Sequence, residues 1–152
     1  MDYMLDIIIP RGELNRIGLL EVLREWGGEK YSSTPAMYVT DSNIEFMEVT
    51  DLSYYNRFLN FQISKEFVGL HLKSDIFYDF ELYANSQIVQ TEDNELLVFL
   101  KSLFVLSKFY IILVREDELA KEKYMISSLE ELESVLLKSV NWVSPTDVVL
   151  YK

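Results

Sequence analysis

The longest apolar stretch of the chain, LLVFLKSLFVLSKFYIILV at residues 96–114, restricts the possible folds more than any other segment. A helix that spans a bilayer needs about 20 continuous apolar residues, and Lys101 and Lys108 interrupt this stretch. These lysines are seven residues apart, as are Asn94 and Lys101, so all three lie along one stripe of a helix. The run FYIILV at 109–114 has the composition of a strand that is covered on both faces. The stretch therefore predicts an amphipathic helix followed by a buried strand, and no membrane span.

Alternation of apolar and polar residues predicts a sheet that is built from hairpins. Two β-rich runs separated by a polar turn make residues 36–50 one hairpin. The alternation returns at 68–73 and again at 76–83. A strand at 86–90 is expected to pair with 76–83 as the second half of another hairpin. Residues 51–64 fit either a short helix or an extended strand.

Three segments carry helix signals. Apolar residues follow a helical spacing over 14–26 and stop at a Gly-Gly pair, which is typical of a helix C-terminus. Asp93 or Asn94 can cap the helix of the long apolar stretch. Ser128 and Glu131 form the capping box S-x-x-E in front of a helix with leucines at the spacing of a buried face.

The order of these elements predicts the fold class. Strands also occur near 7–10 and 124–126, and SPTDVVLYK at 144–152 reads as a turn and a closing strand. Strands grouped in hairpins with about three helices predict an α+β fold with a mostly antiparallel sheet. Because no Ser/Gly/Pro-rich linker and no internal repeat occurs, we expect residues 1–152 to form a single globular domain.

Composition excludes several kinds of chemistry. The chain has no cysteine, which rules out disulfides, thiolate metal sites and a cysteine nucleophile. It contains no G-x-G-x-x-G, Walker A or G-x-S-x-G motif. Its one histidine, His71, cannot build a two-histidine metal site and is expected to be an ordinary surface or half-buried residue. We therefore expect no enzyme, no metal and no cofactor.

The charge balance indicates the kind of partner. The net charge of −11 disfavours a nucleic-acid partner and an anionic membrane, since both attract Lys and Arg, and it permits a cationic protein. The N-terminus has acids where a signal peptide needs a basic region, so the expected location is the cytoplasm.

Nearly all of the excess negative charge lies in two segments, between Lys30 and Arg57 and between Lys73 and Lys101. Together they carry ten acids and no base, whereas the other 99 residues carry 15 acids and 14 bases. One interpretation is that charge protects sheet edges and keeps the protein soluble. The other is an electrostatic face that attracts a basic partner and holds it with tyrosines.

The second interpretation predicts a partner-binding face on the two acidic hairpins. Its candidate residues are Asp41, Glu45, Glu48, Asp75, Asp79, Glu81 and Tyr83. Two alternatives remain open. The aromatic residues could line a pocket for a small molecule or a regulatory ligand, or Asp79 and Glu81, two apart on one strand face, could act as a catalytic carboxylate pair.

The C-terminal segment FYIILVREDELAKEKYMISSLEELESVLLKSVNW, residues 109–142, combines a buried strand, a charged connection and an SLEEL-type helix. In this combination it resembles small acidic bacterial immunity proteins, which are the antidotes encoded beside secreted toxins. The resemblance implies a one-to-one inhibitor of a cognate toxin, commonly a nuclease with a basic active site. It assigns no binding residue in this chain.

Overall fold

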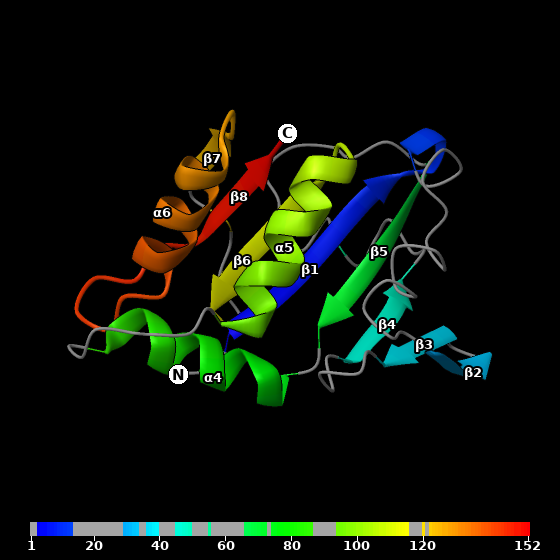
Figure 1. Cartoon of the computed structure of the whole chain (residues 1–152), viewed down its shortest axis with the longest axis horizontal. Coiled ribbons are helices and arrows are strands. Elements are labelled where there is room, and N and C mark those ends of the chain that lie inside the picture. The colour runs from blue at the N-terminus through cyan, green and yellow to red at the C-terminus, as the bar shows by residue number, and fades with distance from the viewer. Residues whose placement is uncertain are drawn as a thin grey trace.

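The computed structural model describes residues 3–13, 29–33, 36–39, 45–49, 55, 66–72, 74–86, 94–115, 120 and 122–152. Their main element is one eight-stranded sheet with the order β2-β3-β4-β5-β1-β6-β8-β7 (Figure 1). The strands are β1 (Tyr3–Pro10), β2 (Glu29–Ser33), β3 (Ala36–Val39), β4 (Glu45–Val49), β5 (Phe67–Leu72), β6 (Tyr110–Arg115), β7 (Glu122–Met125) and β8 (Val148–Tyr151). Neighbouring strands are antiparallel except β7 and β8, which are parallel. Parallel neighbours need a crossover connection, and here it contains a helix.

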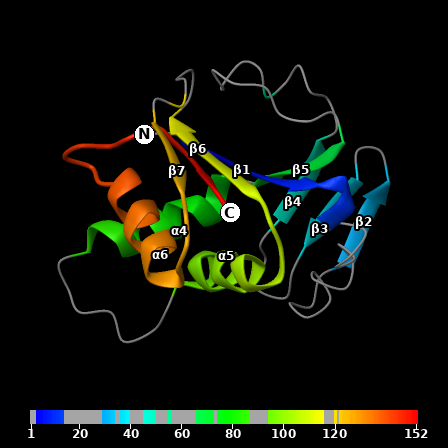
Figure 2. The same cartoon turned by 90° about the horizontal axis from the view of Figure 1, so that it is seen from above.

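Three helices cover one face of the sheet: α4 (Ser74–Asn85), α5 (Glu95–Leu106) and α6 (Leu129–Ser139) (Figures 1 and 2). With a mostly antiparallel sheet on one side and helices on the other, the fold is α+β, as the sequence predicts. In the part of the chain that the structure describes, no helix has both the length and the apolar character needed to cross a bilayer.

The long apolar stretch forms a helix followed by a strand, as the sequence predicts. Asn94 caps α5, because its side chain accepts a hydrogen bond from the backbone N–H of Leu97 at 3.2 Å. The chain then enters β6, which lies between β1 and β8 near the middle of the sheet. Ile111 and Leu113 of β6 pack under the helices, while Ile112 and Val114 are buried on the opposite face. A strand that is covered on both faces therefore explains the run without alternation.

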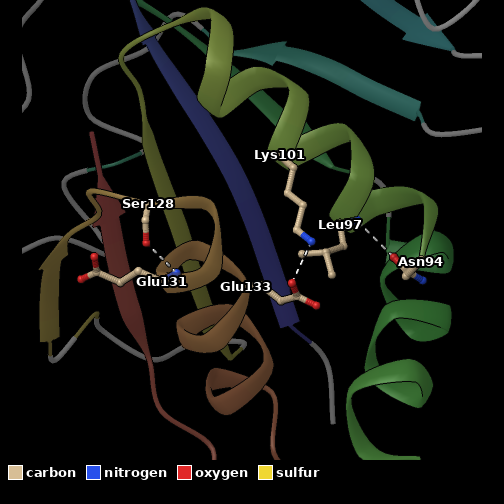
Figure 3. A network of polar contacts seen from close by, with 6 residues as sticks. All are labelled: Asn94, Leu97, Lys101, Ser128, Glu131 and Glu133. Atoms are coloured by element: carbon tan, nitrogen blue, oxygen red, sulfur yellow. Dashed lines mark hydrogen bonds and ion pairs between the residues drawn. The ribbon is translucent and has the colours of Figure 1, made fainter. Parts of the chain in front are cut away.

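The capping box of α6 forms with one difference from the usual pattern. The Ser128 side chain accepts from the backbone N–H of Glu131 at 3.1 Å, as predicted. The Glu131 carboxylate accepts from the backbone N–H and the hydroxyl of Ser127, at 3.2 and 2.8 Å, one residue earlier than the N-cap. On the neighbouring turn Glu133 accepts from Lys101 of α5 at 2.7 Å, so an ion pair links the two helices (Figure 3).

The alternation of β1 sorts its side chains between two cores. Leu5, Ile7 and Ile9 pack against the helices, and Ile8 belongs to the smaller cluster on the other face. Asp6 lies on that second face and is fully buried. A buried carboxylate in a central strand needs a specific partner, which is described below.

The structure confirms most of the predicted strands and corrects one. The hairpin at 36–50 is β3 and β4, and the strand at 68–73 is β5. The strands near 7–10 and 124–126 and the closing strand are β1, β7 and β8. The strand predicted at 76–83 is wrong, because these residues belong to the helix α4. The predicted helix over 14–26, most of 51–64 and most of the returning strand at 86–90 lie outside the described residues.

Candidate interaction surface

The helical conformation of α4 has a clear physical cause. Phe77, Phe80 and Ala84 recur at helical spacing, and the two phenylalanines are buried against the sheet. Their rings contact each other with centroids 5.5 Å apart, and Phe77 also packs 5.2 Å from the ring of Tyr3 in β1. A strand would direct Phe77 and Phe80 to opposite faces, so only a helix buries both in the same core.

Because residues 76–83 form a helix and not a strand, Asp79 and Glu81 lie on different sides of α4. Residues two apart on a helix point about 200° apart around its axis, instead of to the same side as on a strand. Asp79 is exposed, whereas Glu81 is 6% exposed and faces the interior. The two carboxylates therefore do not share a site, and the catalytic pair loses the geometry on which it was proposed.

The other predicted binding residues do not form a face made of two hairpins. Asp41 lies outside the described residues, Glu45 begins β4, and Asp75 belongs to the first turn of α4. Glu48 is half-buried and lies opposite Leu70 of β5, on the sheet face that the helices cover. Tyr83 is half-buried too and packs against the core. Of the predicted residues whose side chains are described, Asp79 is the exposed one.

An anchored tryptophan is the feature that the sequence did not predict. Glu81 accepts a hydrogen bond from the indole Nε1–H of Trp142 at 2.6 Å. Asn85 accepts from the backbone N–H of Trp142 at 2.9 Å, and its amide group donates to the carbonyl of Val140 at 2.8 Å. The end of α4 thus fixes the loop after α6 through Trp142, by one bond to its backbone and one to its side chain. Even so, Trp142 remains 49% exposed.

Exposed apolar residues lie on the two elements that meet at this tryptophan, the helix α4 and the loop after α6. Tyr78 and Leu82 are one helical turn apart on α4 and are 59% and 41% exposed, and Val143 is 94% exposed. We call Tyr78, Asp79, Leu82, Trp142 and Val143 the α4–Trp142 surface. The helix that carries it contains three acids and neither Lys nor Arg. The surface therefore combines exposed aromatic rings with negative charge.

A buried polar cluster lies beneath Glu81, at the end of the sheet. Asp147 is fully buried and accepts from Arg115 three times: from its backbone N–H at 2.8 Å, from Nε at 3.2 Å and from a terminal nitrogen at 2.7 Å. The Tyr3 hydroxyl is buried, and it has no hydrogen-bond partner among the described residues. Burial raises the pKa of Tyr3 above its ordinary value of 10.0, and the negative charge of Glu81 and Asp147 adds to this while Arg115 opposes it.

The raised pKa of Tyr3 predicts a loss of stability in alkali. The unfolded chain releases this proton near pH 10.0 but the folded chain retains it, so the stability that Tyr3 contributes is complete below that pH and declines as pH rises toward the folded pKa. Tyr3→Phe is expected to change the free energy of unfolding by less than about 1 kcal/mol at pH 7, since its hydroxyl lacks a described partner. Above pH 10.0 the variant should lose less stability than the wild type in urea denaturation. Tyr78→Phe, at an exposed position, is the control and should follow the wild type; equal alkaline losses for all three proteins would contradict the prediction.

The single histidine has a specific partner on the second face of the sheet. Its Nδ1 lies 2.8 Å from Oδ1 of Asp6, across the paired strands β1 and β5. The side chain of His71 is 28% exposed, in agreement with the half-buried position expected for it. The other Asp6 oxygen, Oδ2, has no hydrogen-bond partner among the described residues. Within those residues no group of three or more His, Asp or Glu side chains is placed to hold a metal.

The tyrosines with described side chains do not converge on one cavity. Tyr3 is buried under the helices and Tyr55 on the opposite face, whereas Tyr78 and Tyr124 are exposed. On the second face, the ring of Tyr110 stacks on that of Tyr151 in β8, with centroids 5.9 Å apart. This distribution does not favour an aromatic pocket. Comparison with known proteins adds no assignment: no protein-family model matches the chain, and no curated protein or solved structure matches it either.

Proposed function

We propose that this protein is an inhibitor of the immunity type, which binds a basic toxin domain one-to-one through the α4–Trp142 surface and acts in the cytoplasm. One observation supports the proposal most: two hydrogen bonds hold the half-exposed Trp142 against α4, a helix that also exposes Tyr78 and Leu82 and has acids and no base. Residues that contribute most to binding are enriched in Trp and Tyr and lie in a patch that excludes water. Their fixed positions lower the entropy that binding costs.

The charge of the chain supports a basic partner. The net charge is −11, and Asp79 is exposed within the surface. A nuclease that binds phosphates has a positive active site, so a negative surface can occupy the same position. Such complementary charge accelerates association, and added salt weakens that effect. Inhibition then results from blocking the active site, without any chemistry by this chain.

The experiment begins with the neighbouring gene in the source genome. The C-terminal domain of a large secreted protein encoded beside this chain is produced in an inducible host, with and without the protein. We expect that the domain stops growth, that co-expression of this protein restores growth, and that calorimetry gives one-to-one binding. A neighbouring domain that neither inhibits growth nor binds this chain argues against the immunity role.

Reversal of one charge tests the location of the surface. Asp79→Lys is expected to weaken binding to that domain by about tenfold or more, mainly through a slower association rate, because it places a like charge against a basic partner. Glu130→Lys makes the same change at an exposed position on α6 and should weaken binding much less. Surface plasmon resonance at two salt concentrations measures both effects. Equal losses for the two variants would show that total charge matters and the α4–Trp142 surface does not.

A further inference from the structure

We propose that Trp142 receives an arginine side chain of the partner, and that Glu81 is the positioning residue that prepares its ring for this cation. This inference rests on the proposed function and names the chemistry of its central contact. It follows from the way the indole is held, from the charge at its edge and from the exposure of the residue.

The hydrogen bond to Glu81 fixes one edge of the ring and does not engage its faces. An indole N–H lies in the plane of the ring, so the bond of 2.6 Å to Glu81 engages one edge of Trp142. The bond of 2.9 Å from the Trp142 backbone to Asn85 fixes the main chain. With 49% of the residue exposed, the ring is both ordered and accessible. A fixed ring loses little conformational entropy when a ligand stacks on it.

The charge of Glu81 increases the attraction of the ring for cations. Glu81 is 6% exposed, and electrostatic effects are stronger at a buried site than in water. A carboxylate that accepts the indole N–H draws the proton toward itself and leaves more negative charge on the ring. Cations bind to the negative face of an aromatic ring, and tryptophan is the best of the side chains for this.

Other aromatic rings of the protein already have a cation from the same chain. Lys123 Nζ lies 4.8 Å from the ring centroid of Tyr151, and Lys152 Nζ lies 4.5 Å from that of Phe104. Over the Trp142 ring there is no Lys or Arg from the residues that the structure describes. Its hydrogen bonds are to Glu81 and Asn85 alone among those residues. The exposure of Trp142, 49%, is what leaves this residue accessible to a cation from a partner.

The neighbours of Trp142 favour arginine over lysine. A guanidinium group stacks flat on an aromatic ring and is weakly hydrated, whereas an ammonium is compact and strongly hydrated. The apolar side chains of Tyr78, Leu82 and Val143 provide a surface on which the arginine stem can pack.

Short peptides test this contact without the partner. The ¹⁵N-labelled protein has two tryptophans, and Trp142→Phe identifies which indole N–H signal belongs to Trp142. A blocked peptide with two arginines is titrated, and the same peptide with citrulline, the neutral isostere, serves as the control. We expect the arginine peptide to shift the Trp142 signal to saturation and the citrulline peptide to leave it unchanged. A lysine peptide should bind about threefold more weakly than the arginine peptide.

Variants of Glu81 separate its charge from its hydrogen bond. Glu81→Gln keeps an oxygen that accepts the indole N–H and removes the charge, and it is expected to weaken arginine-peptide binding about threefold to tenfold. Glu81→Ala removes both, so binding should weaken further, and the heteronuclear NOE of the Trp142 indole N–H should fall as the ring becomes mobile. Glu130→Gln removes an equal charge from an exposed site on α6 and should leave both measurements near the wild-type values.

Several results would overturn the inference. Arginine and citrulline peptides that shift the signal equally would exclude a cation site, and so would a Glu81→Gln protein that binds like Glu130→Gln. The proposed function fails separately, when the neighbouring toxin domain does not bind. If that domain binds, depends on Asp79 and ignores Trp142→Phe, the inhibitor role stands and the arginine site is wrong.

Discussion

Replacing Asp147 by alanine is expected to lower the free energy of unfolding by about 3–5 kcal/mol, which is typical when one partner of a buried ion pair is removed. Its carboxylate is fully buried and accepts from the backbone and the guanidinium of Arg115. In the alanine variant the Arg115 side chain, 25% exposed, loses its bonds to this carboxylate, and the Arg115 backbone N–H at the end of β6 loses one as well. Urea denaturation at pH 7 measures the loss.

Two further variants check the cause. Asp147→Asn keeps an oxygen for the Arg115 backbone N–H but lacks the charge, so it should destabilise the protein less than alanine does. Asp79→Ala removes an exposed carboxylate and should change the free energy of unfolding by no more than about 0.5 kcal/mol. A loss below about 1 kcal/mol for Asp147→Ala would mean that the pair contributes no more than a surface ion pair.

Some elements could be predicted because their local signals agree. Lys101 lies on the helix that Asn94 caps, as expected, but α5 ends at Leu106, so the stripe predicted to include Lys108 is too long. Ser128 and Glu131 are three residues apart, and they form their capping bond within a single turn. In both cases the determining contacts lie within a few residues along the chain. The sequence then contains all of the information that the element needs.

The helix α4 could not be predicted from alternation because its residues fit two periods. Ile76, Tyr78 and Phe80 alternate as in a strand, while Phe77, Phe80 and Ala84 follow the spacing of a helix. Because aromatic residues are consecutive here, the sequence fits both the strand pattern and the helix pattern, and the β propensity of aromatic residues favours the strand, which is wrong. Burial of both Phe77 and Phe80 in one core decides for the helix.

The candidate surface depends on contacts between distant segments. Glu81 and Trp142 are 61 residues apart in the chain, and Asp6 and His71 are 65 apart. No local period or motif relates such residues. The excess of acid in the segment that contains α4 was visible in the sequence. Trp142 comes to lie against α4 only when the end of α6 packs beside that helix.

Replacing Gly69 by alanine is expected to lower the free energy of unfolding by about 2–3 kcal/mol, toward the upper end of what an extra methyl group costs in a packed core. Gly69 lies in β5 opposite Ile8 and Val49, and the Tyr55 ring covers it. A Cβ atom at this position overlaps the Tyr55 hydroxyl and lies 2.6 Å from Cζ and 2.8 Å from Cε2. The ring is fully buried and packs edge-on against Phe67 with centroids 5.5 Å apart, so it cannot easily move away.

The sign of this effect discriminates between two causes. Alanine in a strand is favoured over glycine by roughly 0.5–1 kcal/mol through backbone entropy, so without the close approach the variant would be the more stable protein. A double-mutant cycle isolates the contact: Gly69→Ala should cost less in a Tyr55→Phe background, which lacks the overlapping hydroxyl, and less again with Tyr55→Leu. Chemical denaturation of the six proteins gives the coupling energies. If Gly69→Ala costs the same in all three backgrounds, the Tyr55 ring is not what requires glycine at this position.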